Sequence, residues 1–182
     1  MARYDLENYE KLLAEAGEFH GDICSGIRTG TRMTMCGLRF LGINDPKGED
    51  GKKLLVFVEI DRCATDAIMA LTGCRPGKRN MKIRDYGKMA ATFINLESGK
   101  AVRVVPARKQ GEECDYTKDS DEELFHVTPV NVPLKPEDLP GKPVHARQCA
   151  RCGETVLDGR EMESAGEILC RPCFKNTNYY VV

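Results

Sequence analysis

The sequence has almost no net charge, no long hydrophobic run, no internal repeat and no low-complexity tract. Its 27 Lys and Arg residues nearly balance 28 Asp and Glu residues, so no strong overall field favours nucleic acid or an anionic membrane. No segment approaches the ~18 apolar residues of a membrane span. The first residues carry charges throughout and contain no apolar core segment, so we expect no signal peptide. These absences predict a cytoplasmic protein that does not enter a membrane.

Cysteine, in contrast, is abundant, with nine residues in a chain of 182. That length suffices for one ordinary domain plus a small appendage, and such a domain can bury a sizeable core without disulfides. In a reducing compartment, cysteines are interpreted first as metal ligands, redox groups or buried apolar residues, and only last as disulfides. The cysteines are therefore the first candidates for chemistry.

The last four cysteines form two C-x-x-C pairs, Cys149 with Cys152 and Cys170 with Cys173, separated by seventeen residues. This spacing is typical of a structural zinc ion held by four thiolates, because each pair turns tightly enough to place both sulfurs on one ion. Four protein ligands leave no open coordination position, so the site is expected to be structural. Two disulfides, or four unligated thiols, are the alternatives. Residues 156–169 are expected to form a hairpin between the two pairs.

Residues 132–144 contain four prolines in thirteen positions, which suits neither a helix interior nor a central strand. We therefore divide the chain into a core (1–131), a proline-rich linker (132–146) and a zinc-binding domain (147–182). Within the core, the spacing of apolar residues predicts a mixture of helices and strands. Helices are expected over 4–15, 24–41, 64–71 and 119–125, and strands over 54–60, 88–96, 101–105 and 125–132.

A second candidate site begins with His20 and Cys24, four residues apart at the start of the second expected helix. A helix N-terminus favours the thiolate of such a cysteine, and a histidine supplies a metal-binding nitrogen or a general base. Cys63 follows the buried strand and opens the next helix, a common position for an active site. The alternative is structural, with Asp22 capping the helix and Cys24 buried.

Other residues of these types have less specific surroundings. Cys74 lies in a loop with Lys78, Arg79 and Asn80, which either holds an anionic group or is simply solvated. Cys36 lies on the apolar stripe of the second helix and is expected in the core. Three more residues, in contexts that suggest no chemistry, are Cys114, His126 and His145.

Five motifs in order resemble the E-subunit family of formylmethanofuran dehydrogenase. They are His20-Gly-x-x-Cys24-x-Gly26-x-x-x-Gly30, Cys63-Ala-x-Asp66-Ala-Ile68, Thr72-Gly-Cys74, Gly77-Lys78-x-Asn80 and Asp85-Tyr86-Gly87-Lys88. The resemblance covers about residues 15–105, and a zinc-binding tail after a proline-rich segment also resembles many members. Three positions depart from the family pattern, since Asp22 replaces a second histidine, Ser25 replaces a proline and Arg79 replaces a glycine.

The resemblance implies an α+β fold, with an antiparallel sheet packed against helices, followed by a small zinc ribbon or treble-clef-like domain. It also implies a homodimer and a cleft, in some members around a metal. Carried over by position, the cleft contains His20, Cys24 and Cys63 as catalytic or metal-binding candidates. Four further cofactor-binding candidates would lie nearby: Asp66, Cys74, Asn80 and Lys88.

These features leave three functions open. The first is a metal-binding accessory protein, with structural zinc in the tail and a second zinc or other transition metal in the core, acting with a protein partner in metal handling or redox chemistry. The second is a thiol-dependent enzyme, or a sulfur or redox carrier, that uses Cys24 or Cys63. The third is a zinc-finger interaction module. Nucleic acid is a disfavoured partner, because residues 141–182 hold six basic and five acidic residues.

Overall fold

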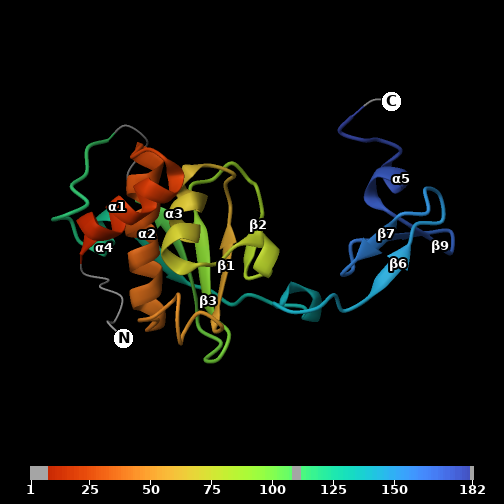
Figure 1. Ribbon diagram of the computed structural model, residues 1–182, viewed down its shortest axis with the longest axis horizontal. Coiled ribbons are helices and arrows are strands. Elements are labelled where there is room, and N and C mark those ends of the chain that lie inside the picture. Colours follow the sequence, from red (N-terminus) through yellow and green to blue (C-terminus); the bar gives the residue numbers. More distant parts are fainter. Residues whose placement is uncertain (1–7, 108–111, 181–182) are drawn as a thin grey trace. The chain divides into compact units, whose positions relative to one another are not determined.

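The computed structural model describes residues 8–107 and 112–180, which divide into two compact units between Pro133 and Leu134. The first unit holds the expected core and the second holds the cysteine-rich tail (Figure 1). No helix in the described part of the chain is long and apolar enough to cross a membrane.

The core is built on a five-stranded sheet whose order is β2-β1-β3-β4-β5. The strands are β1 (Leu54–Val58), β2 (Met81–Ile83), β3 (Ala91–Asn95), β4 (Ala101–Pro106) and β5 (Phe125–Pro129). Only the edge pair β1–β2 is parallel, and the other neighbours are antiparallel. The α+β class with a mainly antiparallel sheet is thereby confirmed, and β3 and β4 form a hairpin.

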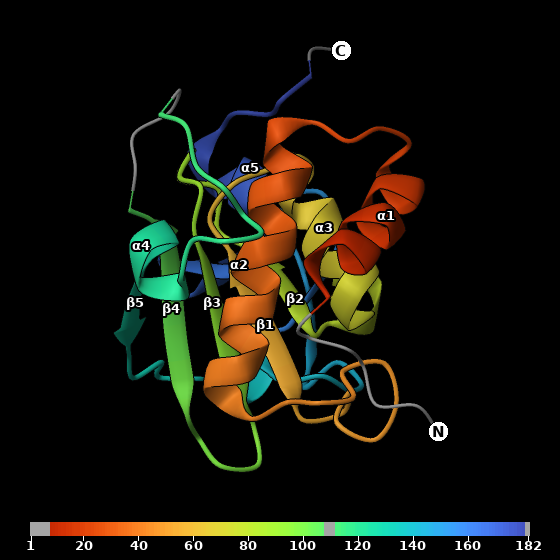
Figure 2. The same ribbon diagram turned by 90° about the vertical axis from the view of Figure 1, so that its left-hand side faces the viewer.

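Three helices cover one face of this sheet (Figure 2): α1 (Tyr9–His20), α2 (Ser25–Leu41) and α3 (Cys63–Thr72). One apolar cluster lies between α2 and the sheet and includes Met33, Leu38 and Phe93. A second cluster joins the three helices and includes Leu12 and Ile27. Helix α2 contributes to both clusters, so its position fixes those of α1 and α3.

The first helix extends beyond residue 15, where the sequence predicts its end. Gly17 is buried inside α1, where its missing side chain leaves room for Ile23, and the helix continues to His20. Gly21 ends the helix instead, with a left-handed backbone at φ 93°. The expected residues 4–7 of this helix lie outside the described part of the chain.

Helix α2 begins with Cys24 as its N-cap, which contradicts the alternative in which Asp22 caps the helix. The Cys24 sulfur accepts a hydrogen bond from the Ile27 amide, at 3.4 Å. The Asp22 carboxylate instead accepts the amide hydrogen of the next residue, Ile23. The sulfur of Cys24 is therefore directed to the helix N-terminus, where the backbone amides stabilise negative charge.

Helices α2 and α3 pack side by side and point in the same direction. A Cβ atom on Gly26 would lie 3.0 Å from the Cβ of Cys63, and one on Gly30 would lie 2.7 Å from the Cα of Ala64. Because successive turns of α2 meet successive residues of α3, the two N-termini lie together. Glycine at both positions allows this close approach.

The remaining core elements are short. Helix α4 (Asp121–Leu124) begins with a capping box between Ser120 and Glu123, and β5 follows it directly. A 3₁₀ turn, η1 (Pro76–Lys78), precedes β2.

The tail unit contains two small hairpins rather than the single hairpin expected over 156–169. Strand β6 (Ala146–Gln148) pairs with β7 (Thr155–Leu157), and β8 (Met162–Ser164) pairs with β9 (Glu167–Leu169). Helix α5 (Arg171–Lys175) follows, and the 3₁₀ turn η2 (Pro136–Asp138) precedes them. The end of the expected linker is tied into this unit, because Val144 donates its amide hydrogen to the Asp158 carboxylate.

Candidate metal centres

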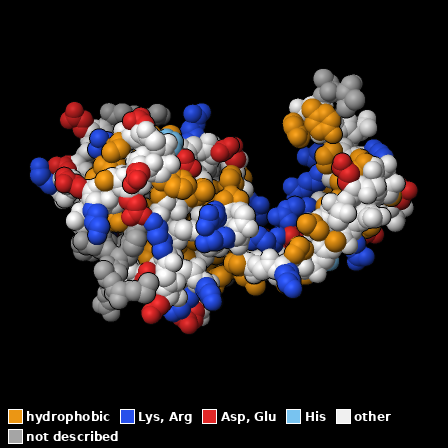
Figure 3. Space-filling view, viewed as in Figure 1, with side chains coloured by type: hydrophobic (Ala, Val, Ile, Leu, Met, Phe, Trp, Pro, Cys, Tyr) orange, Lys and Arg blue, Asp and Glu red, His pale blue; other side chains and the backbone are white. Residues whose placement is uncertain are grey.

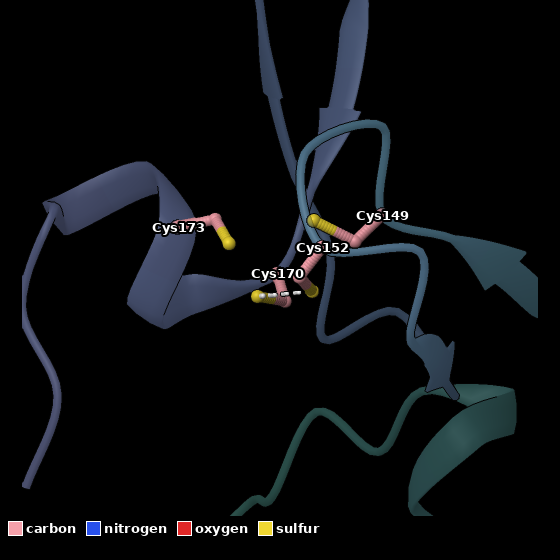
Figure 4. Close-up of side chains that lie close together, drawn as sticks. All are labelled: Cys149, Cys152, Cys170 and Cys173. Atoms are coloured by element: carbon pink, nitrogen blue, oxygen red, sulfur yellow. Dashed lines mark hydrogen bonds between the residues drawn. The ribbon is translucent and has the colours of Figure 1, made fainter. Parts of the chain in front are cut away.

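The four tail cysteines come together as the sequence predicts. Their sulfur atoms all lie within 4.8 Å of one another, and those of Cys152 and Cys170 are 3.9 Å apart (Figure 4). Tetrahedral zinc with bonds of ~2.3 Å needs sulfur–sulfur distances of about 3.8 Å. The first pair lies on the turn between β6 and β7, and the second lies at the start of α5. The arrangement fits one zinc ion with four thiolate ligands.

The electrostatic environment of these sulfurs also favours a bound cation. Backbone amides, that of Cys152 first, lower the pKa of the Cys149 thiol to about 6, so this sulfur carries negative charge. The hydrogen bond with Cys170, burial and the other neighbouring sulfurs raise the pKa of Cys173 to about 12. Four thiolates therefore do not ionise together in so small a space unless a divalent cation balances them. This donor set supports structural zinc.

A second group of metal-binding side chains gathers in the core, where His20, Cys24 and Cys63 place their donor atoms within 4.8 Å of one another. His20 is the last residue of α1, Cys24 caps α2, and Cys63 opens α3. All three side chains are partly exposed. In the described part of the chain, this group and the tail cysteines are the two sets that could hold a metal ion.

Asp66 fixes the orientation of the His20 ring. Its carboxylate oxygen Oδ2 lies 2.8 Å from Nδ1 of His20, and this hydrogen bond raises the pKa of the imidazole. With Nδ1 engaged by the carboxylate, Nε2 is the nitrogen left for a metal. Carboxylates orient metal-binding histidines in this way in many proteins.

The two core cysteines differ in their preferred charge. Burial works against a Cys24 anion, but the amides of Ile27 and Gly26, the Cys63 thiol and His20 together lower its pKa below the ordinary value. The Cys24 sulfur in turn raises the pKa of the Cys63 thiol, and burial adds to this effect. One sulfur is therefore anionic more readily than the other, and a cation between them would allow both to be thiolates.

The four other candidates of the expected cleft do not all reach this group. Asp66 does, through His20. Lys88 lies at the same end of the sheet, because its amide donates to the Glu59 carbonyl just beyond the end of β1. Cys74 lies at the opposite end of α3 and is fully buried, with its thiol 3.8 Å from the carbonyl of Leu54.

Asn80 lies beside the middle of β1 rather than at the end that leads to Cys63, because its backbone carbonyl accepts the Val56 amide hydrogen, while its side chain accepts that of Arg75. Cys74 and Asn80 therefore contribute to loop structure rather than to the His20–Cys24–Cys63 group. Because β2 runs parallel to β1, it starts beside the middle of β1 and runs toward the end that leads to Cys63. Charged side chains of both signs are mixed over the face of the core in Figure 3, without a basic stripe.

Three remaining Cys and His residues have clear surroundings. Cys36 is buried in the core as expected, and Cys114 is partly buried against the same core. The sequence indicates no partner for His145, but its Nε2 lies 2.9 Å from Oε1 of Glu161. Sequence spacing carries no signal for this contact, because the turn between β7 and β8 creates it.

Comparison with known proteins gives the family. Residues 19–128, more than half of the chain, match the family model described as FmdE, molybdenum formylmethanofuran dehydrogenase operon. The chain belongs to the FmdE family. Residues 144–176 match the prokaryotic dksA/traR C4-type zinc finger, which agrees with the four-thiolate tail. The expected resemblance is thereby confirmed for the core, and the zinc-binding nature of the tail is supported independently.

Two relatives extend this comparison. A probable S-adenosyl-L-methionine-binding protein from Archaeoglobus fulgidus is 28% identical over 208 residues, which cover 94% of this chain and 54% of the relative. The chain thus spans about half the length of that curated relative. The crystal structure of a tungsten formylmethanofuran dehydrogenase FmdE-like protein from Syntrophus aciditrophicus has a TM-score of 0.60 at 21% identity, with 99% of this chain and 100% of the other covered. This likeness supports the same fold.

Proposed function

We propose that this FmdE-family chain is a metal-binding accessory protein with a second metal site in its core, formed by His20, Cys24 and Cys63. The observation that carries the proposal is the convergence of one imidazole and two sulfurs within 4.8 Å at the ends of three different helices. Imidazole and thiolate are ligands that zinc and other late transition metals prefer. Zinc is the first candidate, and a related transition metal is the second.

Three protein ligands leave one position of a tetrahedron open. That arrangement is typical of metal sites that exchange a ligand, in contrast to the closed four-thiolate site of the tail. The partial exposure of all three side chains gives an exogenous ligand access to the metal. We therefore assign the tail metal to structure and the core metal to the protein's activity in metal or sulfur handling.

The first experiment is the metal content of the purified full-length protein. Two zinc equivalents per chain are expected, and Cys24→Ser should reduce the count to one without changing the tail zinc. Cys114→Ser is the matched control, because Cys114 is also partly exposed but belongs to neither cysteine group. A count that stays at two in Cys24→Ser would remove Cys24 from the ligand set, and a count of one in the wild-type protein would overturn the core site.

A second experiment tests the orientation of His20 by Asp66. Asp66→Asn keeps the size of the side chain but removes its charge, so the core metal should bind about 10- to 100-fold more weakly. Asp22→Asn is the control, because Asp22 is also an acidic neighbour of His20 but its carboxylate accepts the amide hydrogen of Ile23. Equal affinities for the Asp66→Asn and wild-type proteins, measured by chelator competition, would refute this role.

The family resemblance also leads us to propose a homodimer that works with a protein partner in the cytoplasm. Sedimentation of the full-length protein tests the first part, since a monomer at micromolar concentration would contradict it. The direction of any metal transfer is tested by mixing metal-loaded protein with an apo-acceptor and following the core metal alone.

A further inference from the structure

The pair Cys24 and Cys63 has a geometry that serves a second chemistry besides metal binding. The two sulfurs are at most 4.8 Å apart, whereas a disulfide needs about 2.05 Å, so less than about 3 Å remains to be closed. Both cysteines stand at helix starts, where the backbone is held less tightly than in a helix interior. Gly26 places no side chain between them, and a Cβ there would lie 3.6 Å from each sulfur.

We propose that Cys24 and Cys63 form a reversible disulfide when the core metal is absent and a hydroperoxide is present, so that oxidation and metal binding exclude each other. This inference rests on the proposed function only for the exclusion, since the disulfide depends on the two cysteines alone. It makes the pair a modification site that responds to peroxides.

The reaction balances in two steps. The Cys24 sulfur attacks the distal peroxide oxygen, the O–O bond breaks, and Cys24 becomes a sulfenic acid while the hydroperoxide leaves as an alcohol, or as water when it is hydrogen peroxide. The Cys63 sulfur then attacks the Cys24 sulfur, the S–O bond breaks, and the hydroxyl group leaves as water. Two thiols are oxidised by two electrons in total, and one peroxide is reduced.

The structure gives the two cysteines different parts in this reaction. The Cys24 sulfur accepts the Ile27 amide hydrogen at the N-terminus of a seventeen-residue helix, so the anion that attacks the peroxide is stabilised there. Cys63 lies within reach as the resolving thiol. The tail cysteines are held by zinc, and Cys36 and Cys74 are buried, which leaves Cys114 as the described cysteine that competes for oxidant.

A disulfide would also remove both sulfurs from a metal. The sulfur lone pairs of a disulfide are far weaker metal ligands than thiolates, because the thiolate is the form that binds. His20 alone would then remain of the three donors. Peroxide would therefore prevent a metal-free core site from binding its metal again, and a thiol reductant would restore the site.

The test uses full-length protein whose core metal has been removed by a mild chelator while the tail zinc is retained. Addition of one equivalent of hydrogen peroxide should consume two thiols per chain and lower the mass by two hydrogen atoms, and dithiothreitol should reverse both changes. Trypsin should then yield residues 12–28 linked to residues 63–78, because Arg75 precedes a proline and is not cleaved. Fragment spectra distinguish Cys63 from Cys74 within the second peptide.

Cysteine variants test the role of each sulfur in the oxidation. Cys63→Ser should stop at a sulfenic acid on Cys24 that dimedone traps, Cys24→Ser should slow thiol loss at least tenfold, and Cys114→Ser should behave as the wild-type protein. Protein with its core metal bound should react at least tenfold more slowly than metal-free protein. Separate oxidation of Cys24 and Cys63 without linkage, or linkage through Cys74 or Cys114, would overturn the proposal.

The same samples separate this inference from the proposed function. A second metal equivalent in the reduced protein tests the metal site before any oxidant is added. If the reduced protein binds one zinc but still forms the disulfide, the proposed core metal site is refuted and the proposed disulfide is supported. If two metals bind and no linked peptide appears, the metal site stands and the disulfide is refuted.

Discussion

The parallel packing of α2 on α3 can be tested by comparing the same substitution at two buried glycines. In Gly30→Ala the new Cβ would lie 2.7 Å from the Cα and 2.9 Å from the carbonyl oxygen of Ala64, so the backbone of α3 has to move. In Gly17→Ala the nearest atoms belong to the side chain of Ile23, which is 41% exposed and able to turn away. The two substitutions should therefore have opposite effects.

The magnitudes follow from two opposing contributions. Replacing a helical glycine by alanine stabilises a helix by about 1 kcal/mol. Overpacking against a backbone that must shift costs about 1–3 kcal/mol. Gly17→Ala should therefore gain up to about 1 kcal/mol, and Gly30→Ala should lose up to about 2 kcal/mol, which lowers the Tm of the core by about 5 °C.

Thermal unfolding followed by circular dichroism measures the stability, and chelator competition measures the affinity of the proposed core site for its metal. Because a shift of α3 displaces Cys63, Gly30→Ala should also weaken metal binding at the proposed core site while the tail zinc stays bound. Gly17→Ala should leave both metals unchanged. A Gly30→Ala protein as stable as Gly17→Ala, with full affinity for the core metal, would refute the close packing of the two helices.

Two further predictions concern the tail and the sheet. Cys149→Ser should remove the tail zinc and unfold the tail unit, because that unit buries few apolar residues besides its cysteines. The core should keep its own Tm. Proteolysis confined to residues after Pro133 would show this outcome, and an unchanged zinc content would contradict it. At the end of β1, the hydrogen bonds from Arg103 hold the pKa of Glu59 below its usual range. The stabilisation of the folded state by the Glu59–Arg103 pair is thus complete above the unfolded-state pKa of about 4.3, and it is lost as pH falls through the lower folded-state pKa of Glu59. Urea midpoints of Glu59→Gln should accordingly fall less steeply below about pH 4 than those of the wild type, and parallel curves would refute the coupling.

Residues close together in the sequence form the parts of the sites that the sequence predicts. Contacts between residues far apart in the sequence become visible only in the structure. Both pairs of tail cysteines are local motifs, and one ion joins them, so their spacing alone predicts the site. His20 and Cys24 are local too, but Cys63 and Asp66 lie about forty residues further along and reach them only through the packing of α2 and α3. The Gly26 and Gly30 stripe indicates that some backbone approaches closely, but it does not identify α3 as the partner.

The direction in which each helix or strand runs in the fold is also not predicted by composition or periodicity. The motif containing Cys74 and Asn80 follows α3, and each apolar pattern gives an element without its orientation. Since α3 leads the chain back along β1, whatever follows it begins at the far end of the sheet. The chain returns to the site end only after β2, which is why Lys88, and not Asn80, lies beside the end of β1.

The position of the core site follows from the same two helices. Parallel helices of 17 and 10 residues place their N-termini together, and the partial positive charges of both ends then lie close to one another. Such an arrangement favours negative charge at that point, and Cys24 and Cys63 are the residues that the chain places there. In the proposed metal site, a metal ion would bind the sulfurs that these helix ends favour as anions, so the site would gain affinity from an arrangement that the packing of the core requires. The proposed metal binding and the proposed disulfide would consequently depend on one structural feature, the pair of helix ends that holds the two sulfurs close together.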